Sequence, residues 1–429
     1  MGMGIYFGSS DRVWYHETNL KEGDYLDLWL TNIRMETSYI KENGWTSGSQ
    51  TKRVAIGISE EKIAEILPME EWKNTTGANV IDGQNQLLLP GLIEKHCHLD
   101  KSKLGTPWRP VTPAANLVER FETEIPQLDA LPLSIKERAQ QLIDLELPHG
   151  VVSFRSHIDI EPMTGLRYFE AITDLLADKP FASELVLFPQ HGLLRSDAVT
   201  LIEEALATDK ASFIGGVDPY TLDQDYQQSL KTTFELAKKG NVGIDIHLHD
   251  RKEAGRATIK EIIRLTKESA MAGKVFISHA FGLNDFEGAE REKVFQALAD
   301  LDIHIVSSIP ISQGTIPPLK ELQSYGVAVH IGCDNIYDSW SSLGDGSLQE
   351  KLARYLEIFG VQSQEALTQA LGLVTDGRVP LDQEGNQQWP KVGDSADFLL
   401  TPVSSTAEFV ARKGHVSCSF FKGQPIYKA

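Results

Sequence analysis

The chain has 429 residues, 41% hydrophobic and 24% charged, with a formal net charge of −19. This length exceeds what one compact core usually holds, and it predicts one large domain with a smaller companion. The strong negative charge argues against nucleic acid or an anionic membrane as a partner, because their phosphates would be repelled, and it favours a small molecule.

Cysteine content and the opening residues bear on the compartment. Three cysteines are too few for a disulfide framework, which indicates a reducing environment. The first residues lack the basic and apolar regions of a secretory signal, and no apolar run reaches the roughly 18 residues that a membrane span requires. We therefore expect a cytoplasmic protein.

Both ends of the chain carry short alternating runs that are typical of β-strands. Examples are "YLDLWLTNIRM" and "RVAIGISEEKIAEI" on the N-terminal side and "VGDSADFLLTPV" on the C-terminal side. We expect residues 1–88 and 385–429 to form one small β-sandwich domain built from both termini.

Between these flanks, a strand-and-helix unit repeats at intervals of about 30 residues. Eight short apolar runs are separated by segments with apolar residues at i, i+3 and i+4, such as "ATIKEIIRLTKESAMAG". Eight buried strands that alternate with helices predict an α/β fold, a (β/α)8 TIM barrel, over residues 89–384. The long first gap, residues 101–150, predicts a lid or an extra helix over the mouth of the barrel.

Chemically active side chains gather at the predicted C-terminal ends of these strands, where TIM barrels place catalytic groups. Seven of the twelve histidines lie there, which scattered core histidines would not do. In chain order the strand ends carry His96 and His98, His157, Gln190 and His191, Asp218, His247 with His249 and Asp250, His279, and Asp334 with Asn335.

Four of these residues predict a metal site. His96 and His98 are two residues apart in an extended segment, so their side chains point to the same side. With His247 and Asp334 they give three imidazoles and one carboxylate, which leaves a position open for water at a catalytic centre. This set suits one divalent cation, Zn²⁺ or Fe²⁺, with Mn²⁺ as a further candidate. We interpret Asp218, which precedes a proline, as a turn residue rather than a ligand of a second metal.

The motifs resemble those of a known family when they are taken in order. "PGLIEKHCHLDK", "FRSHIDI", "LFPQHG", "IDIHLHD", "SHAF" and "GCDNIYDSW" are similar to motifs of the cytosine-deaminase branch of the amidohydrolase superfamily, and especially of its triazine-pathway members. The resemblance implies one metal ion held by His96, His98, His247 and Asp334, with a small-molecule heterocycle as substrate. A homo-oligomer is expected by analogy only.

The resemblance also implies roles for residues around the metal. His279 would lie beside a metal-bound hydroxide, and Asp334 would accept a proton from the attacking water. Gln190 would hydrogen-bond a carbonyl edge of the ring, Trp340 would wall the ring, and His157 and Asn335 would be further pocket groups. Lys101 and Lys103 predict a basic patch near the mouth.

One departure from the family pattern leaves the proton shuttle open. Cytosine deaminases carry a glutamate three residues after the fifth-strand histidine, whereas this chain has Asp250 there, preceded by His249. We expect a hydrolase of non-peptide C–N bonds that removes ammonia or an alkylamine from an aminopyrimidine or aminotriazine through a metal-bound hydroxide. The alternative is a cytosine- or isocytosine-type deaminase that releases only ammonia. A cyclic-amide hydrolase or a non-catalytic relative fits the motifs less well.

Overall fold

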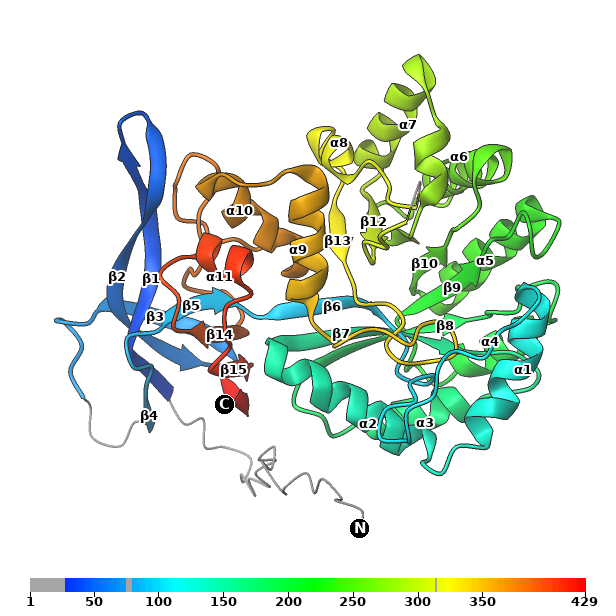
Figure 1. Cartoon of the computed structure of the whole chain (residues 1–429), viewed down its shortest axis with the longest axis horizontal. Coiled ribbons are helices and arrows are strands. Elements are labelled where there is room, and N and C mark those ends of the chain that lie inside the picture. Colours follow the sequence, from blue (N-terminus) through cyan, green and yellow to red (C-terminus); the bar gives the residue numbers. More distant parts are fainter. Residues whose placement is uncertain (1–27, 75–78, 313–314) are drawn as a thin grey trace, which may run out of the picture.

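A computed structural model describes residues 28–74, 79–312 and 315–429 of the chain. They form two parts, a barrel and a smaller β domain (Figure 1). The portion of the predicted β domain that precedes residue 28 lies outside the described residues.

The larger part is a barrel of parallel strands whose order in space follows their order in the chain. Most residues of these strands are buried, as expected when helices cover the outside of a parallel sheet. The strands are β6 (Leu92–Cys97), β7 (Val151–Asp159), β8 (Ala182–Phe188), β9 (Phe213–Val217), β10 (Gly243–His247), β11 (Val275–Ser278), β12 (Ile303–Ser307) and β13 (Val329–Ile331).

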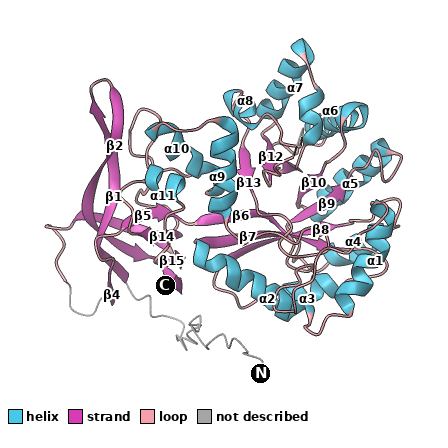
Figure 2. Ribbon diagram, in the orientation of Figure 1, coloured by secondary structure: helices cyan, strands magenta, loops and turns pink. Residues whose placement is uncertain are grey.

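Helices surround the barrel strands on the outside (Figure 2). The long connection from β6 to β7 carries α1 (Leu117–Asp129) and α2 (Ile135–Glu146), which confirms the extra helix predicted there. The remaining helices of the barrel are α3 (Arg167–Leu176), α4 (Val199–Leu206), α5 (Tyr226–Gly240), α6 (Lys252–Glu268), α7 (Gly288–Asp300), α8 (Leu319–Ser324) and α9 (Leu348–Phe359), with 3₁₀ turns at Leu147–His149, Phe281–Asp285 and Leu371–Val374.

The smaller part is one mixed sheet built from both ends of the chain, in the order β16-β15-β14-β5-β1-β2-β3 with β4 beside β1. Its longest strands form a hairpin whose two-residue turn, Asn43-Gly44, has positive φ at both positions, as the favoured hairpin turn requires. The strands are β1 (Leu28–Glu42), β2 (Trp45–Ser59), β3 (Lys62–Pro68), β4 (Asn79–Asp82), β5 (Leu87–Pro90), β14 (Phe398–Thr401), β15 (Cys418–Phe421) and β16 (Gln424–Lys428).

The predicted fold class, a (β/α)8 barrel with a small β domain from both termini, is confirmed. On the positions of these strands we propose the domain division 1–88 plus 385–429 around 89–384. Two short helices, α10 (Gln364–Ala370) and α11 (Thr406–Arg412), lie with α9 between the two parts (Figure 1).

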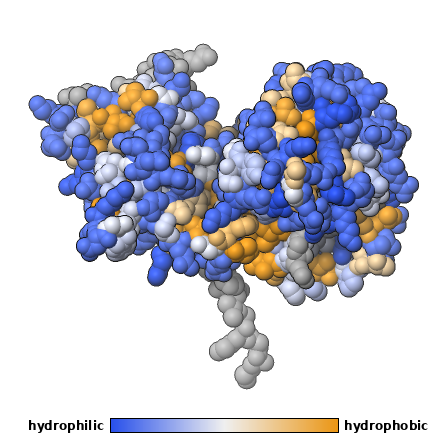
Figure 3. All heavy atoms as spheres, turned by 90° about the horizontal axis from the view of Figure 1, so that it is seen from above, coloured by the Kyte–Doolittle hydropathy of each residue, from blue (hydrophilic) through white to orange (hydrophobic). Residues whose placement is uncertain are grey.

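Each part has its own apolar core. The larger cluster of buried apolar side chains belongs mainly to the barrel and its helices, and a smaller one lies within the β domain. Figure 3 shows the two parts as two lobes whose visible surface is mainly hydrophilic, with scattered apolar patches. Within the part of the chain that the structure describes, no helix combines the length and the apolar character needed to cross a membrane.

The barrel closes where its first and last strands meet. The backbone N–H of Asp334 donates to the carbonyl oxygen of His96 at 2.6 Å, and Cys97 pairs with Asp334 in a parallel bridge. Gly332 allows this approach, because a Cβ built there would lie 2.5 Å from Cβ of His96 and 2.7 Å from its backbone nitrogen. Closure therefore brings the ends of β6 and β13 together.

Replacing Gly332 by alanine tests this closure. We expect Gly332→Ala to lower the free energy of unfolding by about 1–3 kcal/mol, because the added methyl group overlaps the backbone of β6. The control is Gly48→Ala, since the nearest heavy atom to a Cβ at Gly48 is 4.0 Å away. Denaturant unfolding measures both variants, and equal losses of stability would contradict the tight closure.

Candidate active site

A cavity of about 300 Å³ lies at the C-terminal ends of the barrel strands. Most side chains that the sequence places at strand ends meet around it. The lining residues are His98, Leu117, Phe121, Phe188, Gln190, Val217, Asp218, His247, His249, His279, Asp334, Asn335 and Trp340.

A cluster of histidine rings adjoins this cavity. The ring centres of His96 and His98 lie 5.4 Å apart, and the ring of His247 lies 4.5 Å from the first and 5.5 Å from the second. Nε2 of His96 and Nε2 of His98 each lie 3.5 Å from Oδ1 of Asp334. The structure thus brings the four residues predicted as metal ligands together.

The hydrogen bonding and charge of the cluster fit a bound cation. Nε2 of His96, Nδ1 of His98 and both ring nitrogens of His247 are buried without a hydrogen-bond partner among the described residues. Burial lowers the pKa of His98 to about 4 and that of His247 well below its usual value, so both rings stay neutral near pH 7. Neutral imidazoles are the form that binds a divalent metal.

Asp334 supplies the negative charge of the cluster. Burial by itself would raise the pKa of this carboxyl group. The nearby rings of His96 and His98 outweigh burial and hold the pKa of Asp334 well below its usual value. One ionised carboxylate among several imidazoles is a donor set typical of catalytic Zn²⁺ and Fe²⁺ sites.

His157, predicted to contact substrate, is not among the residues that line the cavity. Its side chain is fully buried, and its ring centre lies 4.3 Å from that of His96 and 4.5 Å from that of His247. Possible ligand atoms of these three histidines lie within 4.8 Å of one another, as do those of His96, His279 and Asp334. Because its ring packs against the cluster, we interpret His157 as an additional candidate ligand and not as a substrate contact.

A chain of polar side chains continues from His96 into the barrel. Nδ1 of His96 lies 2.9 Å from the hydroxyl oxygen of Ser278, and that hydroxyl donates to Oδ1 of Asp245 at 2.7 Å. Arg155 donates to Oδ2 of Asp245 at 3.1 Å. Such a chain of side chains fixes the tautomer and orientation of a metal-binding imidazole. Neither Ser278 nor Asp245 was predicted as a site residue from the sequence.

Asp218 holds His249 at the cavity wall. Its Oδ1 accepts hydrogen bonds from the backbone N–H groups of His249 at 2.6 Å and of Asp250 at 2.9 Å, and its Oδ2 lies 2.9 Å from Nδ1 of His249. Burial lowers the pKa of His249, but Asp218 outweighs burial and raises it overall. The ring of His249 also stacks on that of His279 at a centroid distance of 4.3 Å. Asp218 is therefore a partner of His249 as well as the turn residue predicted from the sequence.

Of the two candidate proton shuttles, only His249 lines the cavity. The carboxylate of Asp250 accepts hydrogen bonds from the hydroxyl group of Thr221 and from its backbone N–H, the latter at 3.3 Å. These bonds turn the side chain of Asp250 towards the loop after β9. Its position therefore does not support the catalytic role predicted for it.

Three side chains of the site stand on backbone that L-residues rarely adopt. The φ angle is 37° at Asp218, 66° at His279 and 64° at Asp334. Such conformations cost of order 1–3 kcal/mol each and cluster at functional sites. Because the backbone turns at these positions, strict alternation along the strands does not predict where their side chains point.

Gln190, Asn335 and Trp340 line the cavity, as the resemblance implied. Asn335 donates to Oδ1 of Asp334 at 2.9 Å. The side-chain carboxylate of Asp338 supports the Trp340 loop by accepting the backbone N–H of Trp340 at 2.7 Å.

Lys101 forms no basic patch at the surface. Its side chain is fully buried, with Nζ 2.8 Å from Oδ1 of Asp159 and 3.8 Å from Oε2 of Glu124. Burial lowers the pKa of Lys101, but these carboxylates outweigh burial and raise it overall, so the ammonium group stays charged. Glu124, which comes from α1, was not predicted as a site residue from the sequence.

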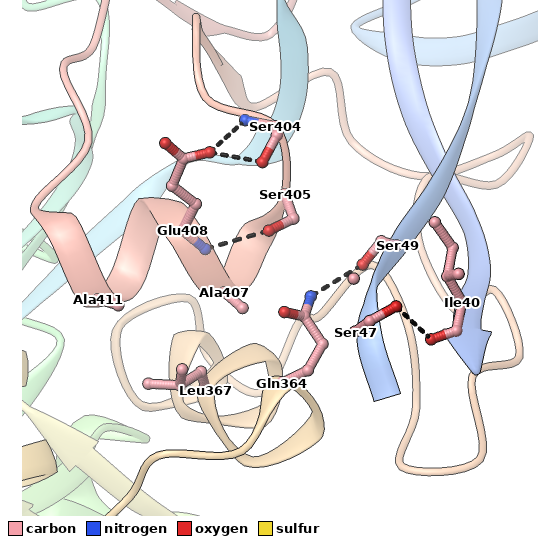
Figure 4. A pocket seen from close by; sticks show the side chains of 11 residues that line it. Ile40, Ser47, Ser49, Gln364, Leu367, Ser404, Ser405, Ala407, Glu408 and Ala411 are labelled. Atoms are coloured by element: carbon pink, nitrogen blue, oxygen red, sulfur yellow. Dashed lines mark hydrogen bonds between the residues drawn. The ribbon is translucent and has the colours of Figure 1, made fainter. Parts of the chain in front are cut away.

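A second cavity, of about 490 Å³, lies between the β1–β2 hairpin, α10 and α11 (Figure 4). Its polar lining is paired internally: Glu408 accepts from the backbone N–H and the hydroxyl group of Ser404, and Gln364 donates to the hydroxyl group of Ser49 at 3.1 Å. No histidine or cysteine is among its lining residues, so the chemistry concentrates at the barrel cavity.

Comparisons with known proteins agree with this geometry. Residues 137–427 match the profile of a family described as "Amidohydrolase family". The chain is 35% identical over 405 residues to an uncharacterised protein of Escherichia coli (strain K12), YahJ, covering 93% of this chain and 87% of that protein. It is 27% identical over 386 residues to N-isopropylammelide isopropyl amidohydrolase of Pseudomonas sp. (strain ADP), and the match covers 87% of this chain and 93% of that protein.

A solved structure has the same fold. The crystal structure of N-isopropylammelide isopropylaminohydrolase from Burkholderia multivorans superposes with a TM-score of 0.81 at 25% identity, covering 94% of this chain and 98% of that one. The sequence resemblance is thereby confirmed. This chain belongs to the amidohydrolase family and is a hydrolase of non-peptide C–N bonds.

Proposed function

We propose that this enzyme removes an amino or alkylamino substituent from a nitrogen heterocycle of the aminopyrimidine or aminotriazine type. Water adds to the ring carbon, the exocyclic C–N bond breaks, and ammonia or an alkylamine leaves while the ring carbon keeps the oxygen as a carbonyl. One observation carries the proposal. The cluster of predicted metal ligands and the Asp218–His249 pair lie at the same cavity.

The ligands we propose for the metal are His96, His98, His247 and Asp334, whose donor atoms converge beside the cavity. A divalent cation bound there, Zn²⁺ or Fe²⁺ with Mn²⁺ as a further candidate, lowers the pKa of a water ligand and polarises the carbon under attack.

Side chains of the protein then transfer the protons and orient the water. Asp334 accepts a proton from the attacking water, since its carboxylate is ionised and borders the cavity. His249 gives a proton to the departing nitrogen, because its raised pKa favours the imidazolium form. Burial keeps His279 neutral by lowering its pKa well below its usual value, and its buried Nε2 has no hydrogen-bond partner among the described residues. His279 therefore orients the water. Transfer of the proton from Asp334 to His249 restores both residues.

The comparisons support an alkylamine as one leaving group. The relative from Pseudomonas and the solved structure from Burkholderia are both named for action on N-isopropylammelide, and each comparison covers most of both chains. The pairing of a histidine, rather than a carboxylic acid, with the leaving group distinguishes this site from the cytosine-deaminase pattern.

The test uses purified protein reconstituted with Zn²⁺, Fe²⁺ or Mn²⁺. The panel contains aminopyrimidines, aminotriazines and N-alkylated triazines, with products followed by mass spectrometry. We expect an oxo-ring product together with ammonia or an alkylamine. Release of ammonia only, from cytosine or isocytosine alone, would favour the stricter deaminase. No turnover with any metal-loaded preparation would contradict the proposal.

Removing the charge of Asp218 tests the proton shuttle. We expect Asp218→Asn to lower kcat by about 100-fold or more while the metal content is unchanged, because His249 loses the partner that orients and charges it. The matched control is Asp225→Asn, at the N-cap of α5, where asparagine caps as well as aspartate does. Steady-state kinetics and metal analysis measure both variants. A wild-type kcat in Asp218→Asn would exclude the shuttle role.

Removing the hydroxyl group of Ser278 tests the chain behind His96. We expect Ser278→Ala to weaken metal binding by about 10–100-fold, because Nδ1 of His96 loses the partner that fixes its tautomer. Competition with a chelator measures the affinity, and the exposed Ser324→Ala on α8 is the control. Unchanged affinity in Ser278→Ala would show that the chain does not act on the metal site.

A further inference from the structure

Helix α1 contributes one face to the cavity. Leu117 and Phe121, four residues apart, both line it. Glu124, at the next position on the same face, is fully buried beside them. The ring of Phe121 lies 4.8 Å from that of His191 and 6.0 Å from that of Trp340. A helix from the β6–β7 connection thus forms part of the binding wall.

The carboxylate of Glu124 joins two residues that line the cavity. Oε2 accepts a hydrogen bond from Nε2 of Gln190 at 2.7 Å, and Oε1 accepts one from the indole Nε1 of Trp340 at 3.0 Å. Gln190 follows β8 and Trp340 lies in the loop after β13, so α1 ties together two distant loops. Both oxygens of one buried carboxylate are used in this way.

Glu124 and Lys101 together fix the orientation of the Gln190 amide. The ammonium group of Lys101 donates to Oε1 of Gln190, and Glu124 accepts from Nε2. A flipped amide would present its NH₂ group to the ammonium and its oxygen to the carboxylate, and both contacts would be repulsive. Only one orientation is therefore stable.

The Gln190 amide can form further hydrogen bonds with a substrate. The bond to Glu124 uses one of the two N–H groups of the Gln190 amide, and the bond from Lys101 uses one of the two lone pairs on its oxygen. One N–H and one lone pair of this amide therefore remain unpaired within the described residues. An adjacent donor and acceptor of this kind match a ring edge that carries –NH–C(=O)–. The indole of Trp340 offers an apolar face to the same ring.

We propose that Glu124 is a specificity-determining positioning residue, which holds Gln190 and Trp340 in the one arrangement that selects rings with an –NH–C(=O)– edge. This inference rests on the proposed function for its substrate class. Glu124 does not touch the reacting atoms in this scheme, so it acts on ring binding and not on C–N cleavage.

The kinetic test is Glu124→Gln in the metal-loaded enzyme. The amide has one acceptor oxygen where the carboxylate has two, so it satisfies only one of the two donors. We expect KM for ring substrates with an –NH–C(=O)– edge to rise about tenfold or more while kcat and metal content stay near wild type, and the preference for such rings over rings lacking that edge to shrink. The control is Glu122→Gln, an exposed position on the same helix.

A second readout needs no substrate. The indole N–H resonance of Trp340, in protein with ¹⁵N-labelled tryptophan and assigned with Trp340→Phe, reports the hydrogen bond to Glu124. We expect Glu124→Gln to shift this resonance and Glu122→Gln to leave it in place. If the wild-type enzyme turns over no ring compound, the proposed function fails, while an unmoved Trp340 resonance would independently overturn the role of Glu124. Wild-type KM and ring preference in Glu124→Gln would also overturn it.

Discussion

The site depends on the closure of the barrel at one hydrogen bond, from the N–H of Asp334 to the carbonyl oxygen of His96. A single hydrogen bond of this kind contributes only about 1 kcal/mol of net stability. Its importance is geometric, because it fixes the end of the last strand against the end of the first. The carboxylate of Asp334, in the turn after β13, is thereby placed beside His96 and His98 at the end of β6, and Gly332 leaves the space for this close approach.

Several features of the site are unfavourable for the free energy of folding. Several imidazoles are buried without hydrogen-bond partners, and Asp218, His279 and Asp334 occupy positive φ. Natural proteins retain such unfavourable features mainly at functional sites, where the surrounding structure enforces them. A bound cation would pair with the buried ring nitrogens that lack hydrogen-bond partners. We therefore interpret metal binding as stabilising the folded barrel and offsetting the unfavourable free energy of these features.

The sequence predicted the architecture because periodicity reports burial directly, and it predicted where His96, His98, His247 and His279 lie because strand ends share one edge of a barrel. It did not predict directions at those ends. His157 packs behind the cluster and Asp250 turns to Thr221, and neither orientation follows from alternation once the strand has ended. Asp245 had a weak signal, since it stands two residues before His247 on the same strand. Glu124 had no such signal, because the docking of an inserted helix depends on tertiary packing.

Homo-oligomerisation and a cytoplasmic location stay predictions.

The position of the metal tests the central claim most directly. Crystals of the protein loaded with Zn²⁺ can be measured by anomalous diffraction at the zinc edge. We predict one peak per chain, about 2.0–2.2 Å from a nitrogen of His96, His98 and His247 and from an oxygen of Asp334. No peak within the histidine cluster, or a zinc ion bound by His157 without His98 and Asp334, would contradict this assignment.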